Sequence, residues 1–133
     1  MLPRSLIAAA SVALLTAGCN DIVTQIGPEN DPVVTNEVGT FRYEAHDLDN
    51  VHEEFSFTWS NPGTQAKVLH RGFVPHGSNL IVVRDDAGNE VYRHDMLYQV
   101  DDVTAVGVAG DWTVEFLLHG TTGRIDMQLE TMP

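Results

Sequence analysis

The sequence is poor in cysteine, in basic residues and in long apolar runs, and each scarcity excludes a class of protein. A single cysteine among 133 residues excludes an intramolecular disulfide framework and a thiolate metal cluster. The 7 Lys and Arg residues stand against 19 Asp and Glu, for a formal net charge of −12. Nucleic-acid binding needs clustered cations that face phosphates, so this balance excludes nucleic acid as a partner.

The first residues have the pattern of an export signal. Arg4 precedes a largely apolar run from Leu6 to Leu15, which is followed by the small-residue stretch Thr16-Ala17-Gly18. As a helix this run would rise about 15 Å, half of the roughly 30 Å that a bilayer core requires. We therefore predict a signal peptide over residues 1–18 and exclude it from the reasoning about the fold.

The segment LLTAGC, which ends at Cys19, resembles the lipobox of bacterial lipoproteins, with Thr16 where the family most often has Leu. The resemblance implies that Cys19 receives a diacylglyceryl group, that the preceding peptide is removed and that the new amino terminus is acylated. Acyl chains acting together give stable membrane anchoring. Asn20 follows the cysteine, where Asp would favour the inner membrane, so the resemblance favours the outer membrane. The alternative is a plain secretory peptide with a chance cysteine.

The mature chain divides into a linker and a domain. Residues 19–36, which hold the lipidated Cys19, contain acids, two prolines and a glycine and show no clear periodicity, so we predict a flexible tether there. Residues 37–133 form the predicted domain. Loss of Arg4 leaves 6 basic residues against 19 acidic ones, so anionic lipid repels the domain and the lipid anchor must supply membrane attachment.

From Glu37 onward, apolar residues recur at every second position. Such alternation is typical of strands with one buried and one solvated face. The four clearest stripes are Phe41/Tyr43/Ala45, Phe55/Phe57/Trp59, Trp112/Val114/Phe116/Leu118 and Ile125/Met127/Leu129. We predict turns at 61–63, 75–77, 85–89, 109–111 and 120–123. The fold class is therefore all-β, a single antiparallel β-sandwich of about eight strands in which the first strand pairs with the last.

Three segments resemble small jelly-roll-like domains of secreted bacterial proteins, similar to pre-peptidase C-terminal and CUB-like sandwiches. They are FTWSNPGTQAKV (57–68), SNLIVVRDDAGNEVY (78–92) and GDWTVEFLLHGTTGRIDMQLE (110–130). The resemblance implies a jelly-roll-like sandwich in an accessory role: adhesion, carbohydrate contact or packing against a partner. It brings no catalytic residues with it.

An acidic segment is the candidate metal site. Asp47, Asp49, Asn50 and Glu53 offer oxygen donors within a predicted loop, and Ca²⁺ takes six to eight oxygen ligands. The segment lacks the glycine and the spacing of an EF-hand, and a solvated acidic loop is the alternative. The six histidines show no H-x-H or H-x-x-x-H spacing, so we interpret them as solvated.

No cofactor and no enzyme activity are predicted, because the chain has no G-x-S-x-G motif and no credible base beside its serines. The predicted function is a non-catalytic binding or scaffolding role in the cell envelope, with a protein or glycan partner. The alternatives are a carbohydrate-binding module and a Ca²⁺-dependent accessory domain of a secreted hydrolase system. In the carbohydrate hypothesis Tyr92, Tyr98 or Phe73 stacks on sugar rings. Trp59 and Trp112 are predicted core residues, with Trp112 as a sugar platform being the competing interpretation.

Overall fold

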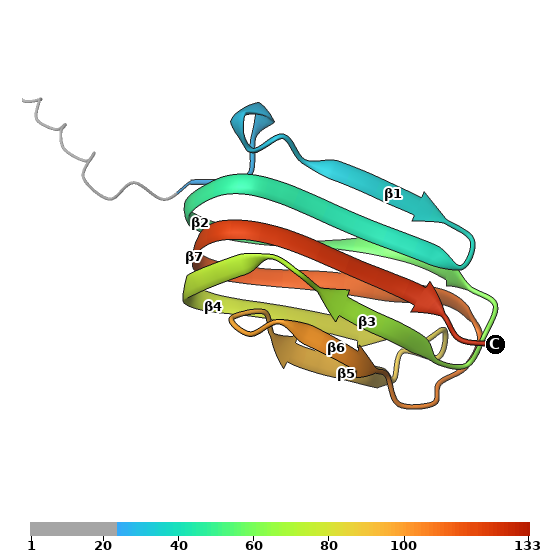
Figure 1. Ribbon diagram of the computed structural model, residues 1–133. Helices are drawn as coiled ribbons and strands as arrows, with labels where there is room; N and C mark the ends of the chain where they lie inside the picture. Colours follow the sequence, from blue (N-terminus) through green and yellow to red (C-terminus); the bar gives the residue numbers. More distant parts are fainter. Residues whose placement is uncertain (1–23) are drawn as a thin grey trace, which may run out of the picture.

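The computed structural model describes residues 24–133, which form seven β-strands and one short 3₁₀ turn, η3 (Figure 1). The elements are η3 (Pro28–Asn30), β1 (Val33–Glu37), β2 (Thr40–Asn61), β3 (Ala66–His70), β4 (Phe73–Arg84), β5 (Glu90–Asp95), β6 (Val100–Val103) and β7 (Gly110–Thr131). All pairings between these strands are antiparallel. Within the described range, no helix is long and apolar enough to cross a membrane.

Two long strands, β2 and β7, join the layers of the fold. They pair along most of their length, with register shifts between Ala45 and His52 of β2. At this bend both strands turn back, so that each contributes one arm to each layer (Figure 1). The front sheet contains β1, residues 40–45 of β2, residues 125–130 of β7, β3 and β6. The back sheet contains residues 52–61 of β2, residues 110–119 of β7, β4 and β5. The all-β class is confirmed, and the arrangement is consistent with a β-sandwich.

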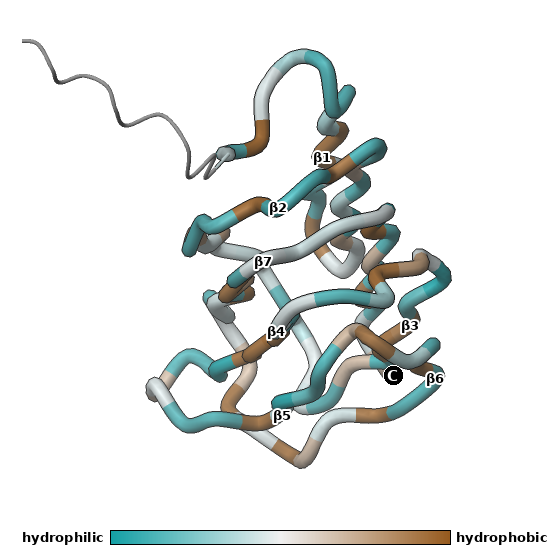
Figure 2. The backbone as a smooth tube through the Cα atoms, turned by 90° about the vertical axis from the view of Figure 1, so that its left-hand side faces the viewer, coloured by the Kyte–Doolittle hydropathy of each residue, from teal (hydrophilic) through white to brown (hydrophobic). Residues whose placement is uncertain are grey.

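The core follows the predicted alternation. Burial alternates along much of β2 and β7, so that every second side chain points between the layers. Hydrophilic and hydrophobic residues alternate correspondingly along the tube in Figure 2. Every residue in three of the four predicted stripes is buried: Phe41, Tyr43, Ala45, Trp112, Val114, Phe116, Leu118, Ile125, Met127 and Leu129. In the fourth stripe Trp59 is buried, but Phe55 and Phe57, on the same edge arm of β2, are only partly buried.

The predicted pairing of the first and last strands is confirmed by the register of β2 with β7, from Thr40 opposite Glu130 to Ala45 opposite Ile125. Some predicted turns were wrong. Residues 75–77 and 120–123 lie inside β4 and β7, and the predicted acidic loop lies inside β2. Glycine and short polar residues indicate that the chain changes direction. Such a change can be a bend within one strand as well as a turn between two strands. This is why the described range holds seven strands instead of eight.

The described part of the predicted tether is packed on the domain. Residues 33–37 form β1, which pairs with residues 40–44 of β2. Asn30 is buried, and its side-chain amide donates to the carbonyl oxygens of His46 and Asp47 at 2.9 and 3.0 Å. These contacts correct the tether prediction for residues 24–36. Composition alone missed them, because β1 is an edge strand with solvated residues on both faces.

Candidate functional site

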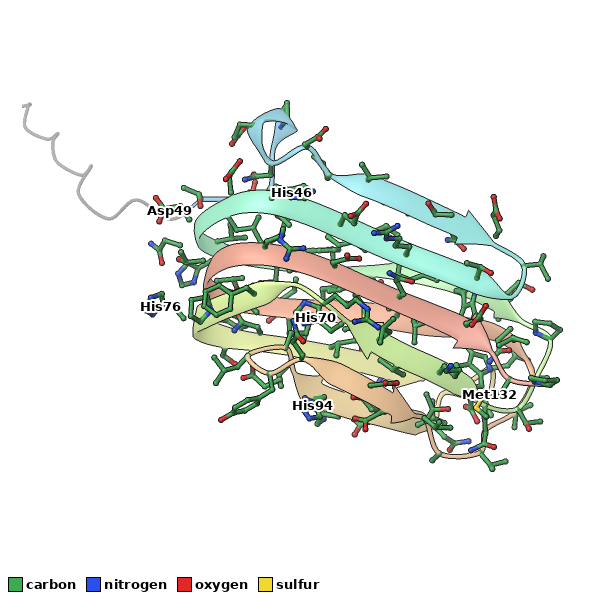
Figure 3. All side chains as sticks on the ribbon, in the orientation of Figure 1. His46, Asp49, His70, His76, His94 and Met132 are labelled. Carbon is green, nitrogen blue, oxygen red and sulfur yellow. The ribbon has the colours of Figure 1, made fainter. Side chains whose placement is uncertain are left out.

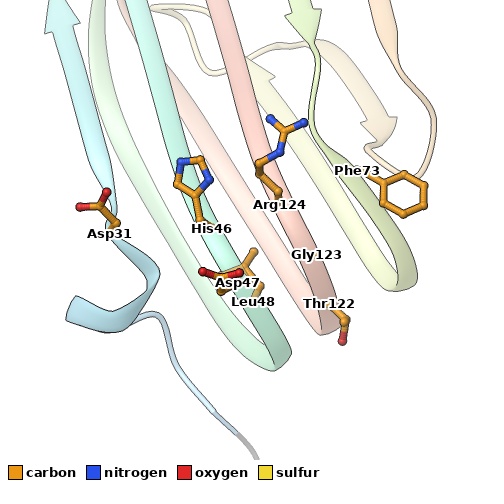
Figure 4. A pocket seen from close by; sticks show the side chains of 8 residues that line it. All are labelled: Asp31, His46, Asp47, Leu48, Phe73, Thr122, Gly123 and Arg124. Atoms are coloured by element: carbon orange, nitrogen blue, oxygen red, sulfur yellow. The ribbon is translucent and has the colours of Figure 1, made fainter.

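An open recess of about 810 Å³ lies at the bent end, which we define as residues 46–52 of β2, 73–78 of β4 and 119–124 of β7. Its lining residues are Asp31, His46, Asp47, Leu48, Phe73, Thr122, Gly123 and Arg124. Figure 4 shows Asp31, His46, Arg124 and Phe73 in this order across the neighbouring segments. The recess therefore combines carboxylates, an imidazole, a guanidinium and an aromatic ring on one surface.

The backbone of the recess is held by local contacts. Asp31 and Asp47 have positive φ angles of 48° and 53°, a conformation that Asp and Asn tolerate better than most residues. The Asn30 amide ties the backbone of the segment before β1 to the bend of β2. Gly123 has φ 124°, and a Cβ at this position would overlap the carbonyl oxygen of Phe73. The close approach of β4 to β7 thus places Phe73 beside Arg124.

The side chains at the recess are available for binding. Phe73 is 65% exposed, although its size favours burial. The Arg124 guanidinium donates to the backbone carbonyl of Arg71 at 3.2 Å, and among residues 24–133 it forms no ion pair with a carboxylate. An apolar ring beside a cation without a carboxylate partner is suited to a ligand that carries both an anionic group and an apolar part.

The predicted calcium ligands lie at the same end. Two of the four are engaged by the protein: Glu53 accepts the backbone N–H of Ile26 at 2.9 Å, and Asn50 Oδ1 lies 3.1 Å from Nε2 of His52. Asp47 and Asp49 are exposed. In the described part of the chain, no three His, Cys, Asp or Glu side chains gather so that they could hold a metal ion. Calcium binding stays a prediction, to be tested by the Ca²⁺ dependence of the melting temperature.

The remaining predicted site residues differ in their exposure to solvent. Cys19 lies outside the described residues. Tyr98, like Phe73, is strongly exposed, at 64%. Tyr92 is partly buried and donates to Asp102 at 2.8 Å, which links β5 to β6 across the two layers. Trp112 is fully buried, which overturns its interpretation as an exposed sugar platform.

Sequence reasoning missed two features, and the first depends on strand pairing. His52 lies directly opposite His119, with ring centroids 6.2 Å apart, although 66 residues separate them along the chain. His119 Nε2 lies 3.0 Å from Glu54 Oε2. The other feature is His70, which is not solvated as predicted but 1% exposed. His70 occupies the third inward position of β3, after Ala66 and Val68. Because this last inward residue is polar, the alternation did not reveal that it is buried.

His70 should make stability depend on pH. Within residues 24–133 neither ring nitrogen has a hydrogen-bond partner. Burial lowers the pKa of His70, and the backbone of Tyr98 and the carboxylate of Asp126 offset this only in part. The unfolded chain therefore takes up the proton near pH 6.5, whereas the folded chain does so only at lower pH. Stability should fall as the pH drops below about 6.5, by at most about 1.4 kcal/mol per pH unit from this group.

The test is His70→Leu, which removes the buried imidazole. We expect the free energy of unfolding of this variant, relative to the wild type, to increase between pH 7 and pH 5 in urea melts. The matched control is His76→Leu, because His76 is exposed on β4, the next strand along the chain. Parallel pH profiles for His70→Leu and the wild type would contradict the prediction.

No protein-family model and no curated protein matches this chain.

Proposed function

We propose that this protein is a lipid-anchored protein of the bacterial cell envelope, whose β-sandwich binds or scaffolds a partner without catalysing a reaction. The observation that carries the proposal is the recess at the bent end, where an exposed ring and a guanidinium that has no carboxylate partner among residues 24–133 stand on paired strands. Side chains on a rigid sheet can hold a fixed arrangement toward a ligand. The lipobox-like segment before Cys19 supports the anchoring part.

The finer assignments rest on the resemblances in the sequence. Similarity to pre-peptidase C-terminal and CUB-like sandwiches favours an accessory role, in which the domain contacts a protein or glycan in the envelope. Asn20 after the lipidated cysteine favours the outer membrane over the inner membrane. The 6 basic against 19 acidic residues that remain without Arg4 also favour attachment through an acyl anchor, because such a chain is repelled overall by anionic lipid.

Cys19→Ser tests the anchoring. Serine cannot form the thioether that carries the diacylglyceryl group, so we expect the variant to leave the membrane fraction or to accumulate as uncleaved precursor. The control is Thr16→Leu, which restores the commonest residue of the lipobox and should preserve processing. Mass spectrometry that finds an unmodified Cys19 in the membrane-bound wild-type protein would refute the proposal.

A carbohydrate-binding module is the second candidate function, and the exposure of Phe73 favours it. A ring that is 65% exposed beside polar groups can stack on a sugar while those groups bind its hydroxyls. Phe73→Ala should then abolish retention on immobilised envelope glycan and leave the melting temperature unchanged. The matched control is Val106→Ala, because Val106 is 69% exposed and lies outside the recess. Unchanged retention of Phe73→Ala would exclude this candidate.

A further inference from the structure

The described chain begins at the bent end of the molecule. Thr24 forms a bridge with Val51, its N–H donates to the Asn50 carbonyl at 3.3 Å, and its carbonyl accepts the N–H of His52 at 2.9 Å. Figure 3 shows Asp49 and His76 at this same end, opposite the end that holds Met132. The contacts of Thr24 therefore fix which end of the sandwich lies nearest to Cys19.

The distance from Cys19 to the domain is short. Four residues lie between Cys19 and Thr24, and the five Cα–Cα steps that join these two residues span at most about 18 Å when fully extended. The polar region on each side of a bilayer core is itself about 5 to 8 Å thick. If Cys19 carries lipid, as the proposed function states, the bent end lies at or close to the headgroups.

The side chains at this end match the chemistry of a zwitterionic headgroup. Arg124 offers a guanidinium that can bind a phosphate in a bidentate manner, and it forms no ion pair with a described carboxylate. Asp31 and Asp47 are exposed carboxylates that can bind an ammonium group. Figure 4 places Arg124 between these acids and the ring of Phe73. Phosphate and amine would thus meet opposite charges in one recess.

The exposed aromatic rings also suit the membrane surface. Phe73 can enter the apolar boundary below the headgroups, since it is 65% exposed next to Arg124. Tyr98 is 64% exposed and lies two residues before Val100. Val100 pairs with His70, the last residue of β3, and β4 begins three residues after His70. Tyrosine is enriched where membranes meet water because its ring is apolar and its hydroxyl polar. Both rings would otherwise expose apolar area to solvent.

We infer that the recess at the bent end binds the phosphate-and-amine headgroup of a zwitterionic phospholipid in the membrane that holds Cys19. This inference rests on the proposed lipid anchor and names the ligand of the same recess. The acids at this end, together with the negative charge of the whole chain, select against anionic lipid. The anchor brings the domain to the membrane, and the recess orients it there.

The test uses the full acylated protein in vesicles of phosphatidylcholine and phosphatidylethanolamine. Acylation consumes the only native cysteine, so one introduced cysteine can carry a nitroxide label: His76→Cys at the bent end, or Val106→Cys outside it. Spin-label relaxation measures how readily a water-soluble nickel chelate collides with the label. We expect a several-fold loss of access at position 76 relative to position 106, and a smaller loss in phosphatidylglycerol vesicles.

Recess variants separate headgroup binding from mere proximity. Arg124→Gln and Phe73→Ser, each added to His76→Cys, should restore access of the chelate, whereas Arg93→Gln on β5 should not. Circular dichroism melts check that each variant is folded, and Phe73→Ser alters a side chain that is already solvated. Protection at position 76 that survives both recess variants would overturn the inference, as would equal access at positions 76 and 106. Absence of acyl chains on Cys19, seen by mass spectrometry, would instead overturn the anchor itself.

Discussion

Trp112→Ala should lower the free energy of unfolding by about 3 to 5 kcal/mol, because it removes a fully buried side chain and leaves a cavity. Trp112 also forms an edge-to-face pair with Trp59, with ring centroids 6.0 Å apart and an interplanar angle of 88°. Its indole N–H donates to the carbonyl of Val108 at 2.7 Å. The variant loses the burial, the ring pair and the hydrogen bond together. Denaturant melts measure the effect directly.

Thr113→Ala is the matched control in the same strand. Thr113 faces away from the core, opposite Thr58 on β2 and Arg84 on β4, and should change stability by less than about 1 kcal/mol. A domain of this size holds about 5 to 15 kcal/mol in total, so Trp112→Ala should be visibly destabilised or unfolded. A variant as stable as Thr113→Ala would mean that Trp112 contributes little to the core.

The period of two in the sequence predicts a large part of the core. Trp112, Val114 and Phe116 point inward as predicted, because a strand between two layers must place every second residue in the interior. The pairing of β2 with β7 was also predictable, since stripes so distant in sequence had to share one core. These features depend on hydrophobicity, which the order of residues records directly.

The features that sequence reasoning missed depend on tertiary contacts. The segment before Glu37 contains polar and proline residues, yet β1 is held by backbone hydrogen bonds to β2 and by the side chain of Asn30. Phe55 and Phe57 have the same pattern as Trp59 and lie on the same edge arm of β2, yet only Trp59 is fully buried. Backbone pairing and the degree of burial along a strand depend on which segments become neighbours, and local composition does not encode that.

The candidate site was predictable only in its parts. The sequence predicts Phe73 as a ring that stacks on sugars and Asp47 as a calcium ligand, but nothing in it joins them to Arg124 or Asp31. They meet because β2 and β7 bend at the same level and β4 follows β7 around the bend. The recess is thus a property of the bend, and the residues that permit the bend control the site.

Gly123→Ala should be among the most damaging small substitutions in the chain. Gly123 has φ 124°, which side-chain-bearing residues rarely adopt, and a Cβ there would overlap the backbone of Phe73 on β4. Left-handed strain costs about 1 to 2 kcal/mol and overpacking typically adds about 1 to 3 kcal/mol. We therefore expect Gly123→Ala to lower the free energy of unfolding by about 2 to 5 kcal/mol.

Gly88→Ala separates the backbone strain from the overpacking. Gly88 also has a positive φ, 86°, but nothing lies within 4 Å of the position that its Cβ would take. This variant should lose only the strain, about 1 to 2 kcal/mol in urea melts. Equal losses for both variants would show that β4 yields without cost at Gly123. If instead Gly123→Ala loses more, the contact between β4 and β7 is rigid, and Phe73 is held beside Arg124 by backbone packing before any ligand arrives.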